Sequence, residues 1–440
     1  MGVGATYLMA NPILTRVVIS LLVLDDQDVV VPQALPASLP LYLLPDWIRE
    51  VEIESSFKTD VVRHLADSEA RRALATRPNR AMQVRIATLE RAESFRLFTS
   101  IFRQADQRAP WPIYSDQMEP TQVSVVESSS TRIFVDRPDL RRVFVGARVL
   151  VLRQATNLRV SSSDVAVVEE VKLDSVLVAG TSFSVSVGDF LFPLMDCEVR
   201  LTHDLGVDTD GIAAGVLELE ELPGASALPS APPQPPVAFP QFQTIPVFPS
   251  SKLQWGGLQA GYLRHGDTGA LGRGSTFFVF GSRPRATFDV DSVALDRQEA
   301  IDLVHFFESR MGRLLPFWIL HPLVFFQATA VDVGFIEVRP PVDGAITDLD
   351  DVMKDVGVLL ADGTEIIRTV SSVSVGGSGW RIVPTSSFPI LALSDIRGVT
   401  TAHIVRFSDD SLSEEWVSPE VCQFSFSLVE LTREIDAELA

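Results

Sequence analysis

An internal repeat limits what this chain can fold into more than any other feature of its sequence. A segment that begins at Arg91 and leads into residues 108–114 has a counterpart that begins at Arg297 and leads into residues 312–318. Both segments place large apolar residues at helical spacing on one face, and both end at a proline beside aromatic residues, where a helix must stop. The sequence therefore predicts that the chain arose by tandem duplication.

The similarity between the two halves extends to both sides of these segments. Residues 78–86 precede the first segment and residues 283–290 precede the second, each with a proline and arginines ahead of a strand. Stretches rich in valine and serine follow in both halves, and their alternating polarity is typical of strands. Each half also closes on a similar strand, residues 216–222 and 426–431. The alternative is two unrelated α+β domains that share a helix ending at proline.

A proline-rich stretch separates the two halves. Because proline removes a backbone donor and restricts φ, we expect an extended, semi-rigid spacer there. The predicted domains are a first copy over residues 1–222, a linker over residues 223–250 and a second copy over residues 251–440. The helix and the many strands predicted for each copy place the fold in the α+β class, mainly β.

Composition favours a folded chain without general affinity for nucleic acid. The chain has 440 residues, of which 46% are hydrophobic and 21% charged, and its formal net charge is −20. Nonspecific binding to phosphate backbones needs clustered cations, which this charge balance disfavours. The most apolar early stretch, residues 13–24, contains Arg16 and is too short for a membrane helix. We expect no membrane span.

The sequence shows no motif for catalysis or for binding a metal or cofactor. Its histidines lack metal-ligand spacing, and Cys197 and Cys422 are too few for a structural zinc site. Residues 208–211 resemble the start of a calcium loop, but residue 219 is leucine where that loop needs a glutamate. Residues 266–274 are glycine-rich and are predicted to be a flexible loop. We therefore predict a non-enzymatic protein with no cofactor and no metal site.

Four motifs, spread over both halves, follow one another in a recognisable order. Residues 306–318 have the pattern Phe-Phe-x-x-Arg-x-Gly-Arg-x-x-x-Phe-Trp, with a proline before the last two residues. The other three are residues 47–80 with Lys58-Thr59-Asp60, residues 188–193, and residues 405–410 followed by Glu430. In this order they resemble minor tail and baseplate proteins, distal-tail-like or hub-like, of long-tailed bacteriophages and gene-transfer agents. The positions of residues 306–318 that match the family motif are Phe307, Arg310, Gly312, Arg313, Pro316, Phe317 and Trp318.

This resemblance implies a particular architecture. Each copy would be a tail-tube-like β-sandwich or part-barrel with one packed helix and an inserted small β module. We place the inserts at about residues 119–205 and about residues 326–413, with the last strand of each copy returning to the core.

The resemblance also implies a function. The chain would be a structural virion protein of the tail tip or baseplate, assembled in the host cytoplasm. It would form a homo-oligomeric ring that connects the tail tube protein to hub and receptor-binding proteins, and it would line the conduit through which DNA passes in transit. The ring would be three-fold, as a pseudo-hexamer of duplicated chains, or six-fold.

Two other functions remain open: a tail-associated carbohydrate-binding module, and a cell-wall-degrading hydrolase that uses two carboxylates. The first would expose tryptophans on one strand face, and Trp255, Trp380 and Trp416 are scattered along the sequence.

Individual residues of the family motif also have two interpretations. The aromatic residues of the motif, with Phe325 and Phe326, form either a patch between subunits or the core of the second domain. Arg310 and Arg313 either bridge to a neighbouring subunit or support the local turn. Gly312 most simply permits a backbone conformation that other residues avoid.

Overall fold

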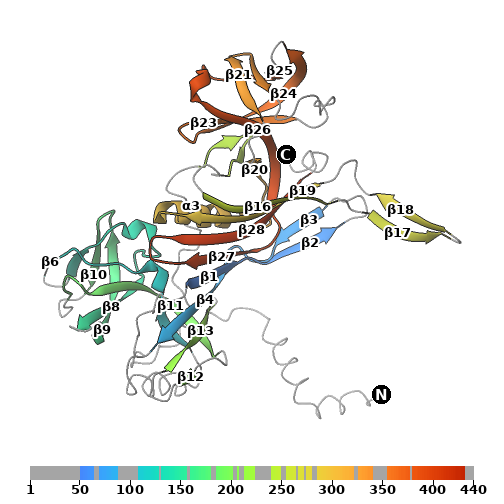
Figure 1. The fold of residues 1–440 in the computed structure, drawn as a ribbon. Coiled ribbons are helices and arrows are strands. Elements are labelled where there is room, and N and C mark those ends of the chain that lie inside the picture. Colours follow the sequence, from blue (N-terminus) through green and yellow to red (C-terminus); the bar gives the residue numbers. More distant parts are fainter. Residues whose placement is uncertain are drawn as a thin grey trace, which may run out of the picture. The chain divides into compact units, whose positions relative to one another are not determined.

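The fold is mainly β, as predicted, with a long helix in the second half (Figure 1). All strand pairs of the described residues are antiparallel, and these residues belong to one compact unit, Leu39–Ala440. Within them, no helix has the length and apolar character needed to cross a membrane. The computed structural model describes residues 50–63, 69–87, 108–127, 130–155, 159–179, 185–201, 206–207, 213–222, 239–248, 254–263, 266–271, 274–279, 285–321, 326–339, 354–376 and 379–431. The repeat helix near Arg91 and the calcium-like residues 208–211 lie outside this range.

In the first half, the main strands pair in the order β1–β4–β13–β11–β5. Alternating residues of these strands are buried, because one face of the sheet covers the core and the other does not. The strands are β1 (Val51–Ser56), β4 (Asn79–Ala87), β5 (Arg108–Pro112), β11 (Phe190–Leu201) and β13 (Ala213–Glu221).

In the second half, the main strands pair in the order β16–β19–β28–β26–β20. The two halves have the same topology. The strands of each half occur in the same succession along the chain, and each strand has the same position in the sheet as its counterpart. The strands are β16 (Gln254–Leu263), β19 (Arg285–Ala294), β20 (Phe317–Leu320), β26 (Ile396–Phe407) and β28 (Cys422–Glu430).

A smaller group of strands is inserted in each half, again with the same pairing. The first group runs β6–β7–β10–β9–β8–β11 and the second runs β21–β22–β25–β24–β23–β26. Each group has its own apolar core. The bounds are β6 (Gln122–Glu127), β7 (Ser130–Phe134), β8 (Arg148–Ala155), β9 (Arg159–Val171), β10 (Ser175–Ala179), β21 (Gln327–Asp332), β22 (Phe335–Arg339), β23 (Asp355–Leu360), β24 (Glu365–Gly376) and β25 (Gly379–Pro384).

One long strand links each inserted group to the main strands by changing partners along its length. In β11, residues 190–193 pair with β8 and residues 194–198 pair with β5. In β26, residues 396–401 pair with β23 and residues 402–405 pair with β20. This single strand returns the chain from the inserted group to the main core.

The two halves share one continuous sheet. Strand β27 (Ser411–Trp416) pairs with β28 on one edge and with β1 of the first half on the other, and Figure 1 shows it between them. In the first half the short strand β12 (Gly206–Val207) pairs with β13 as β27 pairs with β28. The main sheet therefore runs β5–β11–β13–β4–β1–β27–β28–β19–β16.

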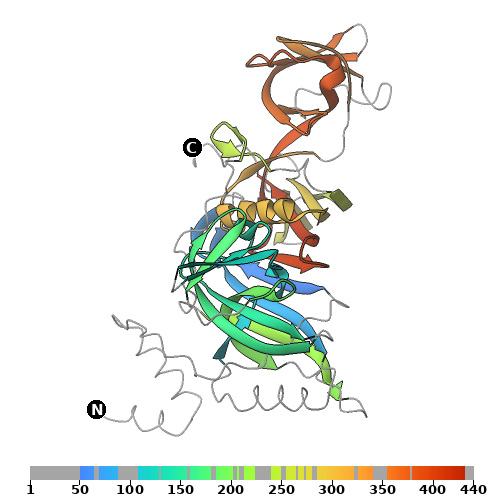
Figure 2. The same ribbon diagram turned by 90° about the vertical axis from the view of Figure 1, so that its left-hand side faces the viewer.

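Helix α3 (Arg297–Arg310) packs against the core side of this sheet (Figure 2). The Asp296 side chain caps its first turn by accepting a hydrogen bond of 2.8 Å from the backbone N–H of Glu299. Met311 ends the helix in the left-handed conformation, with φ of 52°. The apolar stripe of α3, which includes Ile301 and Phe307, is buried against the strands, as the helical spacing in the sequence predicts.

Two short hairpins depart from what the sequence predicts. Residues 239–248 belong to the segment expected to be an extended spacer, but they fold into β14 (Gln241–Phe242) and β15 (Ile245–Pro246). Their turn places Gln243 and Thr244 at positive φ. Residues 266–271, expected to be a flexible loop, form β17 (Gly266–Leu271) and pair with β18 (Gly274–Val279).

The spacer prediction fails for residues 239–248 because apolar side chains there can be buried. Phe248 is fully buried and packs against Phe306 and Phe317. The backbone carbonyl of Phe242 accepts a hydrogen bond of 3.1 Å from Trp318 Nε1. Proline limits backbone hydrogen bonding, but it does not prevent its apolar neighbours from docking on a core.

Candidate functional site

The family-like motifs of both halves meet at Asp410, in the turn between β26 and β27. One carboxylate oxygen accepts hydrogen bonds from the Thr59 hydroxyl at 2.9 Å and the Arg313 backbone N–H at 3.2 Å. The other accepts from the Thr59 backbone N–H at 2.8 Å. The Asp410 backbone carbonyl accepts from the Phe57 N–H at 2.8 Å. We call this cluster, with Gly312, the Asp410 junction.

Gly312 is required at this junction for two reasons. Its φ of 62° lies in the left-handed region, which residues with a side chain adopt only at a cost. A Cβ atom at this position would also lie 3.1 Å from the Cα of Asp410. The interpretation of Gly312 as a backbone requirement is thus supported, and the close approach to Asp410 adds a reason that the sequence does not show.

Three arginines extend the junction. Arg313 forms an ion pair of 3.1 Å with Asp410 and donates a hydrogen bond of 2.9 Å to the Thr59 carbonyl. Arg71, on β3 (Glu69–Ala73), which pairs with β2 (Thr59–Arg63), donates one of 2.8 Å to the Arg313 carbonyl. Arg80 pairs at 2.8 Å with Glu308 of α3, whose side chain is buried. The motif arginines therefore join the two halves of one chain.

The remaining motif residues are part of the second half's core. Phe307, Phe317 and Trp318 are buried, and so is Phe326, which favours the core interpretation over a patch between subunits; Phe325 lies outside the described residues. Arg310 lies 6.0 Å from the centroid of the Phe306 ring and donates a hydrogen bond of 3.4 Å to the Pro316 carbonyl. Burial lowers the pKa of Arg310. Its contacts support the local turn.

A second cluster, buried between the halves, was not identified from the sequence. Arg297 and Asp116 form an ion pair in which the arginine is 2% and the carboxylate 0% exposed. Arg297 also donates to the carbonyls of Ser115 at 2.7 Å and Leu140 at 3.0 Å. Its guanidinium carbon lies 4.6 Å from the centroid of the Trp416 ring. One side chain at the start of α3 thus contacts the inserted group of the first half and the strand that joins the halves.

Arg142 completes this buried network. It donates its backbone N–H to Asp116 at 2.7 Å and its guanidinium to both oxygens of Glu414 at 2.9 Å. Burial by itself would raise the pKa of Asp116, but the positive charges of Arg142 and Arg297 outweigh it and lower that pKa. Burial is also the main reason that the pKa of Arg297 falls to about 10, against the opposing effect of Asp116. Asp116, Arg142 and Arg297 are therefore ionised at neutral pH.

A third cluster places a hydroxyl, an imidazole and a carboxylate in a row. Thr401 Oγ1 lies 2.9 Å from His403 Nε2, and His403 Nδ1 lies 3.1 Å from Glu430 Oε1. The same order of groups activates a nucleophile in acyl-transfer enzymes. Thr401 is only 9% exposed, however, and the other oxygen of Glu430 accepts a hydrogen bond of 2.9 Å from the Ala286 N–H.

The face of the main sheet opposite the core is acidic. Its strand registers bring carboxylates of both halves onto one surface, which we call the acidic face. Glu52 lies directly opposite Glu415, and Glu198 opposite Glu220. The pKa of Glu415 is raised, mainly by partial burial. The nearby negative charges of Glu52, Glu50 and Asp291 raise it further. The acidic face comprises Glu52, Glu54, Glu198, Glu218, Glu220, Asp289, Asp291 and Glu415, and the same registers place Arg85, Arg108 and Arg200 on it.

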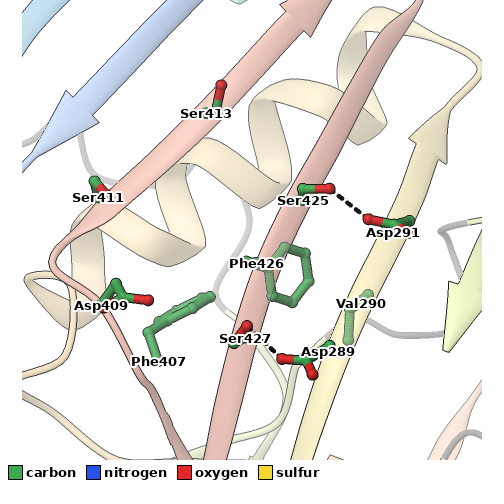
Figure 3. Close-up of a pocket in the computed structure, with 10 residues that line it drawn as sticks. All are labelled: Asp289, Val290, Asp291, Phe407, Asp409, Ser411, Ser413, Ser425, Phe426 and Ser427. Atoms are coloured by element: carbon green, nitrogen blue, oxygen red, sulfur yellow. Dashed lines mark hydrogen bonds between the residues drawn. The ribbon is translucent and has the colours of Figure 1, made fainter. Parts of the chain in front are cut away.

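A pocket of about 290 Å3 opens on the second-half part of this face. Figure 3 shows the serine and aspartate side chains that line it on β19, β27 and β28. Ser427 donates a hydrogen bond of 2.5 Å to Asp289, and Ser425 donates one to Asp291. Within the described residues, no group of histidine, cysteine and carboxylate side chains is arranged to hold a metal ion. The pocket is therefore a polar hollow of the sheet surface with its aspartates already hydrogen-bonded.

Comparison with known proteins adds no relative to these observations. Neither models of known protein families nor curated proteins match this chain.

The Asp410 junction generates a stability prediction. We expect Asp410→Ala to lower the free energy of unfolding by about 2–4 kcal/mol, because it removes the acceptor for Thr59 and leaves Arg313 without its ion pair. The adjacent substitution Asp409→Ala serves as the control and should change stability little. Urea unfolding followed by circular dichroism measures both. Equal stability of the two variants would show that the junction does not hold the halves together.

The buried network predicts a dependence on pH. The pKa of Asp116 lies below its usual value of 3.8, so its ionised form stabilises the fold above that value and this contribution is lost as pH falls through the lowered pKa. Asp116→Asn should cost about 3–5 kcal/mol at pH 7, because buried arginines lose their partner. The difference from the parent protein should shrink as pH falls below 3.8.

Asp139→Asn is the control for this pH series, because Asp139 pairs with Arg137 at the surface and exposed pairs contribute little. Urea unfolding at a series of pH values gives the free energies. A stability difference for Asp116→Asn that stays constant down to pH values well below 3.8 would contradict the assigned ionisation.

Proposed function

We propose that this chain is a structural protein of a bacteriophage tail tip or baseplate. Two tail-tube-like domains, residues 1–222 and 251–440, would form a ring that connects the tail tube protein to hub and receptor-binding proteins. The resemblance of four sequence motifs to minor tail proteins motivates this proposal. Residues of three of these motifs, Thr59, Arg71, Gly312, Arg313 and Asp410, gather in one junction.

One observation carries the proposal: a single strand-pairing scheme occurs in both halves, and the halves join edge to edge through β1 and β27. This contact is heterologous, because it joins the β1 edge of one half to the β27 edge of the other. Heterologous contacts that repeat with a closing rotation generate rings. Because one chain already contains one such contact between its halves, the same type of contact can be repeated between neighbouring chains.

The acidic face supports a position at the wall of a DNA conduit. Carboxylates repel DNA phosphates, and a surface on which negative charges outnumber positive ones disfavours binding of a polyanion as it passes. The carboxylates lie on the exposed face of a sheet that is continuous through both halves. We favour three chains over six, because three duplicated chains present six similar halves to a six-fold tail tube.

This proposal predicts that the purified protein self-assembles. Sedimentation over a range of protein concentrations should reveal a closed species of three chains, or of six, without larger polymers, because a closed ring leaves no open edge. Tail tube protein is added in a second series as the natural template. A chain that remains monomeric at high concentration in both series would contradict ring formation.

A second candidate function is hydrolysis, supported by the row of Thr401, His403 and Glu430. The carbohydrate-binding alternative is weaker, because Trp416 is fully buried and Trp380 packs against Phe326 at 5.8 Å between ring centroids. On the structural proposal, Thr401 is part of the packed strand β26 and does not act as a nucleophile.

We therefore expect purified protein to release no products from cell walls, polysaccharides or ester substrates above the rate in buffer. Turnover that is lost in Thr401→Val, with unfolding unchanged, would favour the hydrolase instead. Thr364→Val, in the turn between β23 and β24, is a control for that substitution.

A further inference from the structure

The strand registers define which residues of the two halves are equivalent. In the first half, Met82 of β4 lies between Ile53 of β1 and Leu219 of β13. In the second half, Phe288 of β19 lies between Ala260 of β16 and Leu428 of β28. β1 and β16 are therefore equivalent edge strands, and Ile53 corresponds to Ala260.

The same comparison makes β12 the equivalent of β27. In β13, Ala214 precedes Leu219 by as many positions as Gln423 precedes Leu428 in β28. Ala214 pairs with Gly206, and Gln423 pairs with Glu415. Gly206 therefore corresponds to Glu415.

Within the chain, the equivalents of these two strands form the contact between the halves. β1 and β27 pair over their whole lengths, from Val51 opposite Trp416 to Ser56 opposite Ser411. The side of the contact that faces the core includes Trp416, which is fully buried. On the acidic face, Ser413 donates a hydrogen bond of 3.2 Å to Glu52.

The corresponding edge in the second half is open within the described residues. There β16 has one partner strand, β19, and its sequence contains no proline. The other end of the main sheet differs, because β5 contains Pro110 and Pro112, which lack the N–H that a further strand would need. An unpaired edge of ten residues is a template for another strand.

We propose that β16 of one chain pairs antiparallel with β12 of the next chain, as β1 pairs with β27 within a chain. The partner is a second copy of this chain, and the inference rests on the proposed ring. Because Glu52 opposite Glu415 corresponds to Gln259 opposite Gly206, the register between chains places Gln259 opposite Gly206. Three chains joined in this way form six like contacts, alternately within and between chains. These contacts close the strands β16, β19, β28, β27, β1, β4, β13 and β12 of each chain into one ring.

Charge supports this register. Within the chain the pair on the acidic face consists of two carboxylates, which repel each other when directly opposite. The pair between chains consists of Gln259 and Gly206, and neither carries a charge. The contact that must form between separate molecules therefore lacks the repulsion that the covalently connected halves tolerate.

Disulfide cross-linking tests the register. Protein carrying only Gln259→Cys is mixed with protein carrying only Gly206→Cys under mild oxidation, so that a covalent dimer can form only between chains. Directly opposite residues in antiparallel strands are close enough for a disulfide. The native Cys197 and Cys422 are buried, and burial raises the pKa of both thiols, so they react slowly.

Two controls frame the result. In the first control, Val333→Cys replaces Gln259→Cys and measures cross-linking by random collision, because Val333 is exposed and lies away from the main sheet. We expect the covalent dimer to form about tenfold faster or more with Gln259→Cys, because strand pairing raises the effective concentration of the thiols. The double substitution Glu52→Cys with Glu415→Cys should cross-link within one chain and leave the protein monomeric on a non-reducing gel.

The outcomes separate this inference from the proposed function. Two results together support both the ring and the β16–β12 register. Positions 206 and 259 cross-link rapidly, and the double variant Gly206→Cys with Gln259→Cys yields covalent species no larger than three chains. A ring seen by sedimentation whose cross-linking does not exceed the Val333→Cys control would overturn the β16–β12 register and leave the ring proposal standing. Absence of any oligomer would overturn the ring and this inference together.

Discussion

The antiparallel pairing of β1 with β27 is the contact on which the rest of the structure depends. It joins strands from opposite ends of the chain, with Val51 opposite Trp416 and Ser56 opposite Ser411, so the two half-sheets have one hydrogen-bonded backbone and one core. Helix α3 fills that core beneath both. Because the contact uses the β1 edge of one half and the β27 edge of the other, it also defines how a further copy can be added.

Buried charges fix the arrangement of the two halves at this contact. Arg297, Asp116, Arg142 and Glu414 are taken out of water between the first inserted group and the second half. Burying ions costs free energy, and the pairs recover it only when their geometry is satisfied. An apolar interface would tolerate sliding, whereas this network is complete in one arrangement. The Asp410 junction acts in the same way at the other end of α3, where Gly312 allows close approach.

Some elements could be predicted from local pattern. The spacing of apolar residues after Arg297 predicts α3, and the aromatic run at Phe317 and Trp318 suits a buried strand. The hairpin of residues 239–248 could not be predicted, because its stability comes from Phe248 packing on α3 and β20. For the same reason Asp116, Arg142 and Arg297 gave no signal: each resembles an ordinary surface charge until its distant partners are known.

By itself the sequence determined that the chain is mainly β, that its halves repeat and where the long helix of the second half lies, because periodicity and repetition are properties of neighbouring residues. Only the tertiary structure decided that the halves share one sheet, that carboxylates of both lie on one face and that β16 has a single partner strand among the described residues. Those features depend on which strands pair, and pairing is set by the burial of side chains that lie far apart in the sequence.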